Sequence, residues 1–237
     1  MVEFRDFYSI MIGDAKCVAL VGGGGKTSLM YAIADYAKDF SSVICTTSTK
    51  IKTPSHMPCM RRVGERLSEH TLICVAEIAE NGKQASPEQS FDELMKLSGL
   101  LIAEADGSKR LPLKTHASWE PAIPECAEKV LAVVGLWGIG EPIIEVVHRP
   151  QLFAERFGKD VNDNATASDV MINVLAYPKV SGLVLNGADD EERQRLAQKM
   201  AAMTDLPVAI TKLKDATVIS EIWRSGKCLL SKRGRAI

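Results

Sequence analysis

The chain has 237 residues, of which 46% are hydrophobic and 25% charged, a composition typical of a globular protein with a full core. The formal net charge of -1 gives no general attraction to nucleic acid or to a membrane surface, so neither is expected as a partner. The six cysteines lack the spacing of a zinc site or a disulfide framework, and no run approaches the roughly 20 apolar residues of a membrane span. These features predict a cytoplasmic protein.

Short apolar runs alternate with amphipathic stretches along the chain. The apolar runs predict strands at residues 17–21, 42–46, 72–76, 100–105, 130–136, 182–185 and 207–210. The amphipathic stretches predict helices at residues 26–38, 88–97, 151–157, 167–176 and 190–202. Continuous apolar strands are typical of a parallel sheet buried on both faces, so we expect an α/β domain over residues 1–237. Residues 107–126 hold three prolines and form a loop long enough to suggest a functional role.

Four successive glycines separate the first predicted strand from the first helix, and Lys26 and Thr27 follow them directly. Glycine lets backbone N–H groups approach a ligand closely, and a helix N-terminus adds unpaired N–H groups and a positive dipole end. In a P-loop, Lys26 would then neutralise the β- and γ-phosphates and Thr27 would bind Mg²⁺. The predicted binding site for ATP or GTP comprises Gly22, Gly23, Gly24, Gly25, Lys26, Thr27 and Ser28.

This motif departs from the usual P-loop pattern, because Leu20 stands where the first glycine is expected. The loop, G-x-x-G-K-T, is two residues shorter and is similar to the nucleotide loop of the Mur ligase family. A glycine-rich turn that only packs a helix on a sheet is the alternative. Strand, glycines, Lys-Thr and helix occur in order, which favours a P-loop NTPase-like, mostly parallel sheet flanked by helices.

Acidic and hydroxyl side chains follow two further predicted strands. Glu104 and Asp106 lie two residues apart, so both point to one face of an extended strand, as in a Walker B element. Either could hold Mg²⁺ while the other orients the attacking group, although Asp106 could instead form a turn. Thr47, in the run "CTTSTKIKTP", could bind Mg²⁺ or simply end a β-branched strand. The catalytic candidates are Lys26, Glu104 and Asp106, and the metal candidates are Thr27, Thr47, Glu104 and Asp106.

Basic residues gather after the acidic strand and again near residue 149. They could receive an anionic substrate or stabilise phosphoryl charge, or they could be a solvated loop. The set consists of Lys109, Arg110, Lys114, His116, His148 and Arg149.

Asn186 and Asp189 follow a late strand with the spacing N-x-x-D. This spacing is similar to the guanine-reading N-K-x-D element of GTPases, but Gly187 replaces the lysine. Both residues are candidates for nucleotide binding. The alternatives are a turn, or capping of the next helix by Asp189 or Asp190, so the base stays open.

The ordered set "LVGGGGKTSLM", "TTSTKIKTP", "EADGSKRLPLK", "EPAIP", "HRPQLF" and "LNGAD" resembles the YqeC family, accessory proteins of selenium-dependent molybdenum hydroxylases. The resemblance spans residues 18–189. It implies a nucleotide-binding protein in selenium cofactor biosynthesis or hydroxylase maturation, with such a hydroxylase or its cofactor as partner.

Three functions remain open at this point. The first is a Mg-dependent NTPase that services a cofactor-bearing enzyme. The second is an ATP-dependent ligase or kinase acting on a small anionic molecule, suggested by the short loop and the basic segment. The third is a nucleotide-sensing module without turnover.

Overall fold

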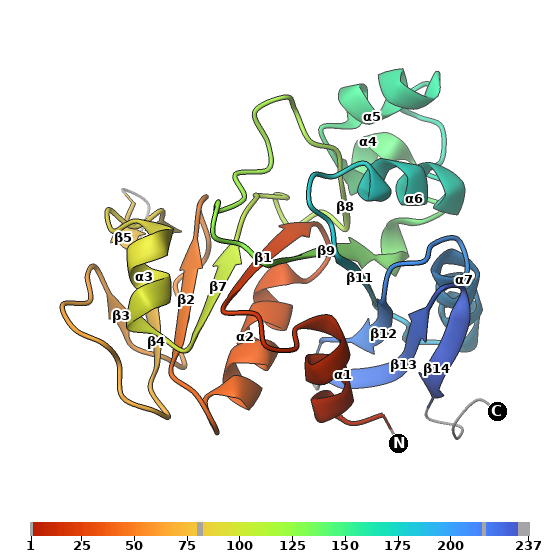
Figure 1. Ribbon diagram of the computed structural model, residues 1–237. Coiled ribbons are helices and arrows are strands. Elements are labelled where there is room, and N and C mark those ends of the chain that lie inside the picture. Colours follow the sequence, from red (N-terminus) through yellow and green to blue (C-terminus); the bar gives the residue numbers. More distant parts are fainter. Residues whose placement is uncertain (1, 80–82, 215–216, 232–237) are drawn as a thin grey trace.

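The computed structural model describes residues 2–79, 83–214 and 217–231, and it is dominated by one large sheet with helices on both faces (Figure 1). The strands of this sheet are β1 (Cys17–Gly22), β2 (Val43–Thr47), β3 (Cys59–Met60), β4 (Leu72–Val75), β7 (Leu100–Glu104), β9 (Lys129–Gly135), β11 (Gly182–Asn186), β12 (Val208–Lys212), β13 (Val218–Arg224) and β14 (Lys227–Ser231). Two small sheets pair β5 (Glu77–Ile78) with β6 (Gln84–Ala85), and β8 (Leu113–Lys114) with β10 (Val147–His148).

The helices are α1 (Phe4–Met11), α2 (Lys26–Ala37), α3 (Phe91–Leu97), α4 (Ile143–Val146), α5 (Pro150–Phe157), α6 (Ala167–Leu175) and α7 (Glu191–Ala201), with a 3₁₀ turn η1 (Leu136–Gly138). None of the helices in the described ranges has both the length and the apolar character needed to cross a bilayer.

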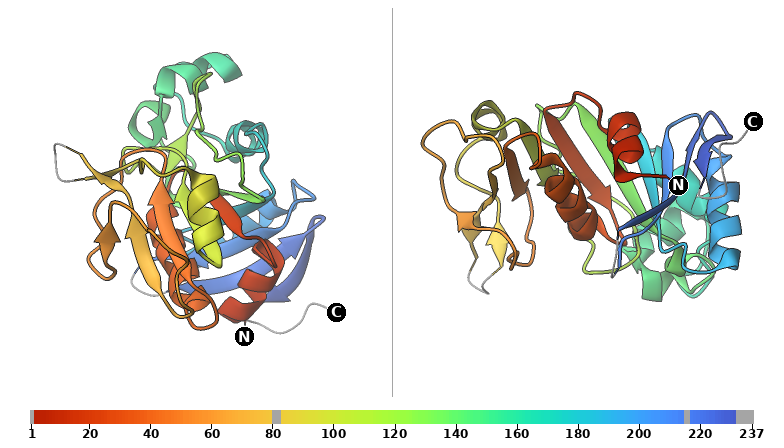
Figure 2. Two further views of the ribbon diagram at one scale, coloured as in Figure 1. Left: turned by 60° about the vertical axis from the view of Figure 1, so that its left-hand side comes forward. Right: turned by 90° about the horizontal axis from the view of Figure 1, so that it is seen from below.

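The strands lie in the order β14-β13-β12-β11-β9-β1-β7-β2-β4-β3. Every pairing from β12 to β3 is parallel, and only β13 and β14 join antiparallel. The prediction of an α/β fold with a mostly parallel sheet flanked by helices is therefore confirmed. Figure 2 shows the β2–β4 side and the β12–β14 side at opposite ends of the molecule.

The helices cover both faces of the sheet because successive residues of its central strands point in opposite directions. On β1, Val18 and Leu20 pack in one core cluster with α1 and α2, through Phe7 and Leu29 among others. The alternate residues Ala19 and Val21 belong to a second cluster that includes α5, α6 and α7. Burial on both faces explains why each strand reads as an unbroken apolar run.

The predicted elements agree closely with the structure, and the largest shift has a local cause. The helix predicted at residues 88–97 begins at Phe91, because the Ser90 hydroxyl caps it by accepting from the amide of Glu93. Helix α1 and the antiparallel pair β13–β14 were not predicted. Strands β13 and β14 are only partly buried, so neither has the unbroken apolar run of the parallel strands.

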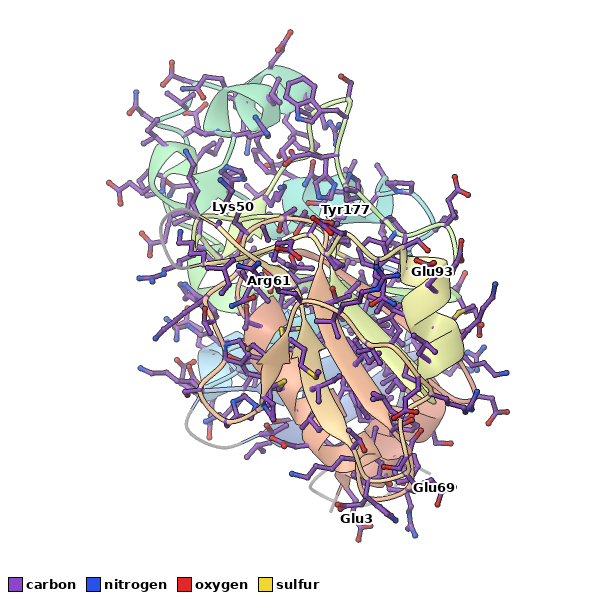
Figure 3. The ribbon with its side chains drawn as sticks, turned by 90° about the vertical axis from the view of Figure 1, so that its left-hand side faces the viewer. Glu3, Lys50, Arg61, Glu69, Glu93 and Tyr177 are labelled. Atoms are coloured by element: carbon purple, nitrogen blue, oxygen red, sulfur yellow. The ribbon has the colours of Figure 1, made fainter. Side chains whose placement is uncertain are left out.

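The connections place β1 at the point where the chain changes direction across the sheet. After β1 the chain builds β2 and β4 on one side, returns as β7 beside β1, and then continues with β9 on the other side. In open α/β sheets, ligands bind outside the carboxyl ends of the strands at such a point. In Figure 3, Lys50 and Tyr177 lie near the upper end of the sheet, and Glu3 and Glu69 lie near its lower end.

Candidate functional site

The glycine run forms the turn between β1 and α2. Gly22, Gly24 and Gly25 have φ values of 95°, 77° and 127°, which L side chains rarely adopt. A Cβ on Gly23 would lie 2.7 Å from the carbonyl oxygens of Leu111 and Pro112. Glycine is therefore required here both for backbone conformation and for close packing under residues 111–112.

Most of the amides in this turn already have acceptors within the protein. The amide of Gly22 donates to Oδ2 of Asp106 at 2.8 Å, that of Gly23 to the Val133 carbonyl at 3.0 Å, and that of Gly24 to the Leu111 carbonyl at 3.2 Å. The amides that begin α2 have no acceptor within the helix, as at any helix N-terminus. The donors that could meet an anion are thus the amides of Gly25, Lys26, Thr27 and Ser28.

Lys26 is buried and faces two carboxylates. Its Nζ lies 3.0 Å from Oδ1 of Asp106 and 3.6 Å from Oε1 of Glu104, and it donates to the Gly22 carbonyl at 2.6 Å. Burial alone would lower the pKa of the ammonium, but the two carboxylates outweigh it and leave the pKa raised. Lys26 therefore remains charged beside the helix N-terminus.

Asp106 links the glycine turn to the long segment after β7. Besides the Gly22 amide, its Oδ2 contacts Nε2 of His116 at 2.5 Å, and Nζ of Lys114 lies 3.8 Å away. Burial would raise the pKa of this carboxyl, but Lys26, His116 and Lys114 lower it far below its usual value. Asp106 is consequently ionised next to Lys26, and only 1% of its surface is exposed to solvent.

Glu104 and Thr27 form a pair next to Lys26. The Thr27 hydroxyl donates to Oε2 of Glu104 at 2.7 Å. Burial raises the pKa of Glu104 despite the nearby Lys26. The structure thus brings together the carboxylate pair of the predicted Walker B strand, since Glu104 and Asp106 both reach Lys26.

The threonine hydroxyls at the end of β2 form hydrogen bonds with main-chain groups. The Thr47 hydroxyl donates to the Glu104 carbonyl at 3.0 Å and accepts from the Thr49 amide at 3.0 Å. Thr46 donates to the Val75 carbonyl at 2.7 Å. Both side chains are fully buried, so the geometry matches the alternative of a β-branched strand end.

A cavity of about 430 Å³ opens beside the N-terminus of α2. Among the described residues, its lining includes six lysines and one arginine but only one carboxylate, that of Glu104. The cations are Lys26, Lys50, Lys52, Lys83, Lys109, Lys214 and Arg110. Trp137, Leu213 and Ile51 add apolar surface. Such a concentration of one sign of charge in a concave site favours an anionic ligand.

Asn186 supports the glycine turn from β11. Its Nδ2 donates to the Gly24 carbonyl at 2.8 Å, and its Oδ1 accepts from the Leu213 amide at 2.9 Å. Asp189 lies apart from this cavity, near Lys212 and Arg193. The structure therefore does not pair Asn186 with Asp189.

Asp190 caps α7 by accepting from the Arg193 amide at 2.8 Å. The capping interpretation of this segment is thus confirmed for Asp190.

The basic set divides into two groups. Lys114 turns inward, donating to the Gly107 carbonyl at 2.6 Å and to Oε1 of Glu120 at 2.9 Å. Arg149 pairs with Oε2 of Glu120 at 2.7 Å. Lys109 and Arg110 line the cavity instead. Nδ1 of His148 is buried and has no hydrogen-bond partner among the described residues. His148 lines a separate cavity with Arg149, and Lys109 borders this cavity as well.

Sequence reasoning missed two residues of this buried network. Glu120 neutralises Lys114 and Arg149, and the Tyr177 hydroxyl donates to the Lys114 carbonyl at 2.5 Å. The Tyr177 ring also lies 3.9 Å, centroid to centroid, from that of His116. Glu120 stands in the run "EPAIP", six residues after Lys114, but no periodicity predicts that these two side chains pair. Tyr177 lies 63 residues from Lys114, beyond the reach of any local pattern.

Comparisons with known proteins show to which family the chain is related. The family model described as "YqeC protein" matches residues 18–151, more than half of the 237-residue chain and the part that holds the glycine turn, Glu104 and Asp106. The chain is also 30% identical over 175 residues to "Uncharacterized protein YqeC" of Escherichia coli (strain K12), with 68% of each chain covered. The chain therefore belongs to the YqeC family.

Proposed function

We propose that this protein is a P-loop NTPase-like protein that binds Mg-ATP or Mg-GTP at the N-terminus of α2 and hydrolyses it. One observation carries the proposal: the open amides of Gly25–Ser28 and the ammonium of Lys26 border a cavity whose described lining holds seven cations and one carboxylate. Amides and cations in this arrangement suit a polyphosphate.

Each residue at the site then has a separate role. The amides of Gly25, Lys26, Thr27 and Ser28 would bind phosphate oxygens. Asp106 keeps Lys26 charged and positioned, while Lys26 neutralises phosphate charge. These residues lie at the N-terminus of α2 and at the adjoining end of β7, which supports a shared role in binding the nucleotide.

The residues present also fit Mg²⁺. Among the described residues no three His, Cys, Asp or Glu side chains gather, but Mg²⁺ at nucleotide sites takes one or two carboxylates, waters and phosphate oxygens. The Thr27 hydroxyl and Glu104, already 2.7 Å apart, are the pair that would hold it. Bound there, the ion would neutralise charge between neighbouring phosphates.

Within this proposal the protein serves selenium cofactor biosynthesis or the maturation of a selenium-dependent molybdenum hydroxylase. This part rests on the family resemblance alone. It predicts that adding such a hydroxylase changes the rate of nucleotide turnover, measured as phosphate release. An unchanged rate at saturating hydroxylase would remove the accessory role and leave the nucleotide site standing.

A second candidate is an ATP-dependent ligase or kinase acting on a small anionic molecule. Lys50, Lys52 and Lys83 favour it, because they extend the positive lining beyond the helix N-terminus. Nucleotide turnover that stays negligible until one small anion is added would identify this activity.

Calorimetric titration with ATP and GTP, each with and without Mg²⁺, tests the proposal. We expect Mg-dependent binding by the natural protein and at least about tenfold weaker binding by the double variant Lys26→Met/Asp106→Asn, since a charge-assisted contact is lost. The double variant removes one cation and one anion together, which limits its effect on folding. Absence of binding by either nucleotide would overturn the proposal. Binding without phosphate release would restrict it to a nucleotide sensor.

A further inference from the structure

Two consecutive residues at the rim of the cavity have an unusual backbone. Lys109 and Arg110 have φ values of 51° and 67°, in the left-handed region that non-glycine residues rarely occupy, and rarely in succession. Backbone strain of this kind persists only where the surrounding structure imposes it, and it concentrates at functional sites.

The surrounding hydrogen bonds show what imposes this conformation. The Leu111 amide donates to the Ser108 carbonyl at 2.9 Å and closes the turn. On one side of the turn, Asp106 accepts from the Gly22 amide; on the other, the Leu111 carbonyl accepts from the Gly24 amide. Both ends are therefore tied to the glycine turn. Because consecutive Cα atoms are about 3.8 Å apart, the two basic residues must lie close to it.

Their side chains are also available to a ligand. Both are exposed and line the cavity together with Lys26, Thr27 and Glu104. Neither has an ion-pair partner in the part of the chain that the structure describes, whereas Lys114 is neutralised by Asp106 and Glu120. Two charged side chains are thus presented, unpaired, at the site of the proposed phosphate binding.

We propose that Lys109 and Arg110 are catalytic residues that contact the terminal phosphate and stabilise its negative charge during transfer. The inference rests on the proposed nucleotide turnover. A water oxygen bonds to the terminal phosphorus while the bond to the bridging oxygen breaks, and the bridging electron pair stays on the nucleoside diphosphate. The water proton is released with the phosphate product. The two cations balance the charge that develops on the phosphoryl and bridging oxygens.

The chain offers a matched control for this proposal. Lys179 is an exposed lysine with a φ of 58°, located shortly before the first residue of β11. It is not among the described residues that line the cavity. Lys179→Gly and the double variant Lys109→Gly/Arg110→Gly each put glycine at positions with a left-handed backbone. Glycine adopts this conformation without strain because it has no Cβ. Both should keep or raise the temperature of thermal unfolding, because the strain is relieved.

The expected result is a separation of binding from turnover. The double variant should bind the Mg-nucleoside triphosphate within about fivefold of the natural affinity, while kcat falls by about 10³-fold, as for removal of a transition-state cation. Lys179→Gly should change neither. An unaltered kcat, or a loss of affinity as large as the loss of turnover, would overturn the catalytic assignment.

A second measurement covers the case of binding without detectable turnover. The natural protein should bind Mg-ADP or Mg-GDP more tightly when aluminium fluoride is added, and the double variant should lose this gain while keeping its affinity for the diphosphate alone. An equal gain in both, or no gain in the natural protein, would refute the inference. Failure of the natural protein to bind any nucleotide would instead reject the proposed function, and this inference with it.

Discussion

The ammonium of Lys26 lies 3.0 Å from Oδ1 of Asp106, and both side chains are almost completely buried. Such a pair is held by mutual neutralisation, so each partner depends on the other. The pair connects the beginning of α2 to the segment after β7, and it makes the glycine turn and the acidic strand end one structural unit.

Replacing Lys26 alone should therefore destabilise the protein. Lys26→Ala leaves the Asp106 carboxylate buried without its closest lysine, which is expected to lower the free energy of unfolding by about 3–5 kcal/mol. The double variant Lys26→Met/Asp106→Asn should lose clearly less, because no charge of the pair is left uncompensated. Urea unfolding of both variants measures the difference. A single variant as stable as the double one would show that the pair contributes little.

Thr27 and Thr47 are both candidate magnesium ligands in the sequence, but replacing them with valine should have different effects. Thr27→Val removes a hydroxyl that faces the cavity and donates to Glu104, so the Mg²⁺ concentration needed for nucleotide binding should rise about tenfold or more. Thr47→Val removes a hydroxyl already used by the Glu104 carbonyl, costing about 1–2 kcal/mol of stability without changing the Mg²⁺ requirement. Magnesium titrations followed by calorimetry make the comparison. Equal shifts in both variants would count against this assignment.

Asn186 should affect both nucleotides equally. Asn186→Ala leaves the Leu213 amide and the Gly24 carbonyl without their partner, so stability should fall by about 1–3 kcal/mol. Because Asn186 supports the turn rather than facing a base with Asp189, the affinities for ATP and GTP should weaken by the same factor. Asp189→Ala serves as the control and should leave the ratio of the two affinities unchanged. A selective loss of GTP binding in either variant would restore a guanine-reading role.

Glu120 should contribute to the loss of stability in acid. Burial alone would raise its pKa, but hydrogen bonds from Arg149 and Lys114 lower it from 4.5 to about 2. A carboxyl with a lowered pKa in the folded state stabilises the protein above its unfolded pKa, and this contribution disappears as the pH falls from about 4.5 towards about 2.

Glu120→Gln should accordingly be less stable than the natural protein at pH 7 and should lose less additional stability between those pH values. Unfolding in urea at a series of pH values measures both effects. Glu125→Gln, at an exposed position, is the control and should follow the natural curve. Parallel curves for Glu120→Gln and the natural protein would contradict the linkage.

Gly23 and Gly107 allow the packing of the glycine turn to be tested on its own. Neither has a positive φ, so alanine introduces no backbone strain at either position. A Cβ on Gly23 would lie 2.7 Å from two backbone oxygens, whereas one on Gly107 would meet nothing within 4 Å. Gly23→Ala should lower the unfolding free energy by about 1–3 kcal/mol and Gly107→Ala by less than about 0.5 kcal/mol. Thermal or urea unfolding compares them, and equal losses would mean that the close approach of residues 111–112 is not required.

Local patterns were sufficient for the sheet and for the acidic strand end. Strands such as β1 and β7 are buried on both faces. A strand of this kind consists of an unbroken apolar run, which predicts the strand from the sequence alone. The two-residue spacing of Glu104 and Asp106 placed both acids on one side of the strand, and both indeed contact Lys26. The glycine run between the first predicted strand and the first predicted helix likewise predicted the turn from β1 into α2.

The partners and surroundings of the polar side chains were decided only by the tertiary structure. The sequence determined that Lys114 and Arg110 are charged and that Asn186 ends a strand. It did not determine that Lys114 would be neutralised inside by Glu120, that Arg110 would remain at the cavity, or that Asn186 would hold the Gly24 carbonyl from 162 residues away. The physical reason is that periodicity along a strand or helix is fixed by the residues of that segment, whereas the partner of a polar group depends on strand order and crossover geometry, which no single segment encodes.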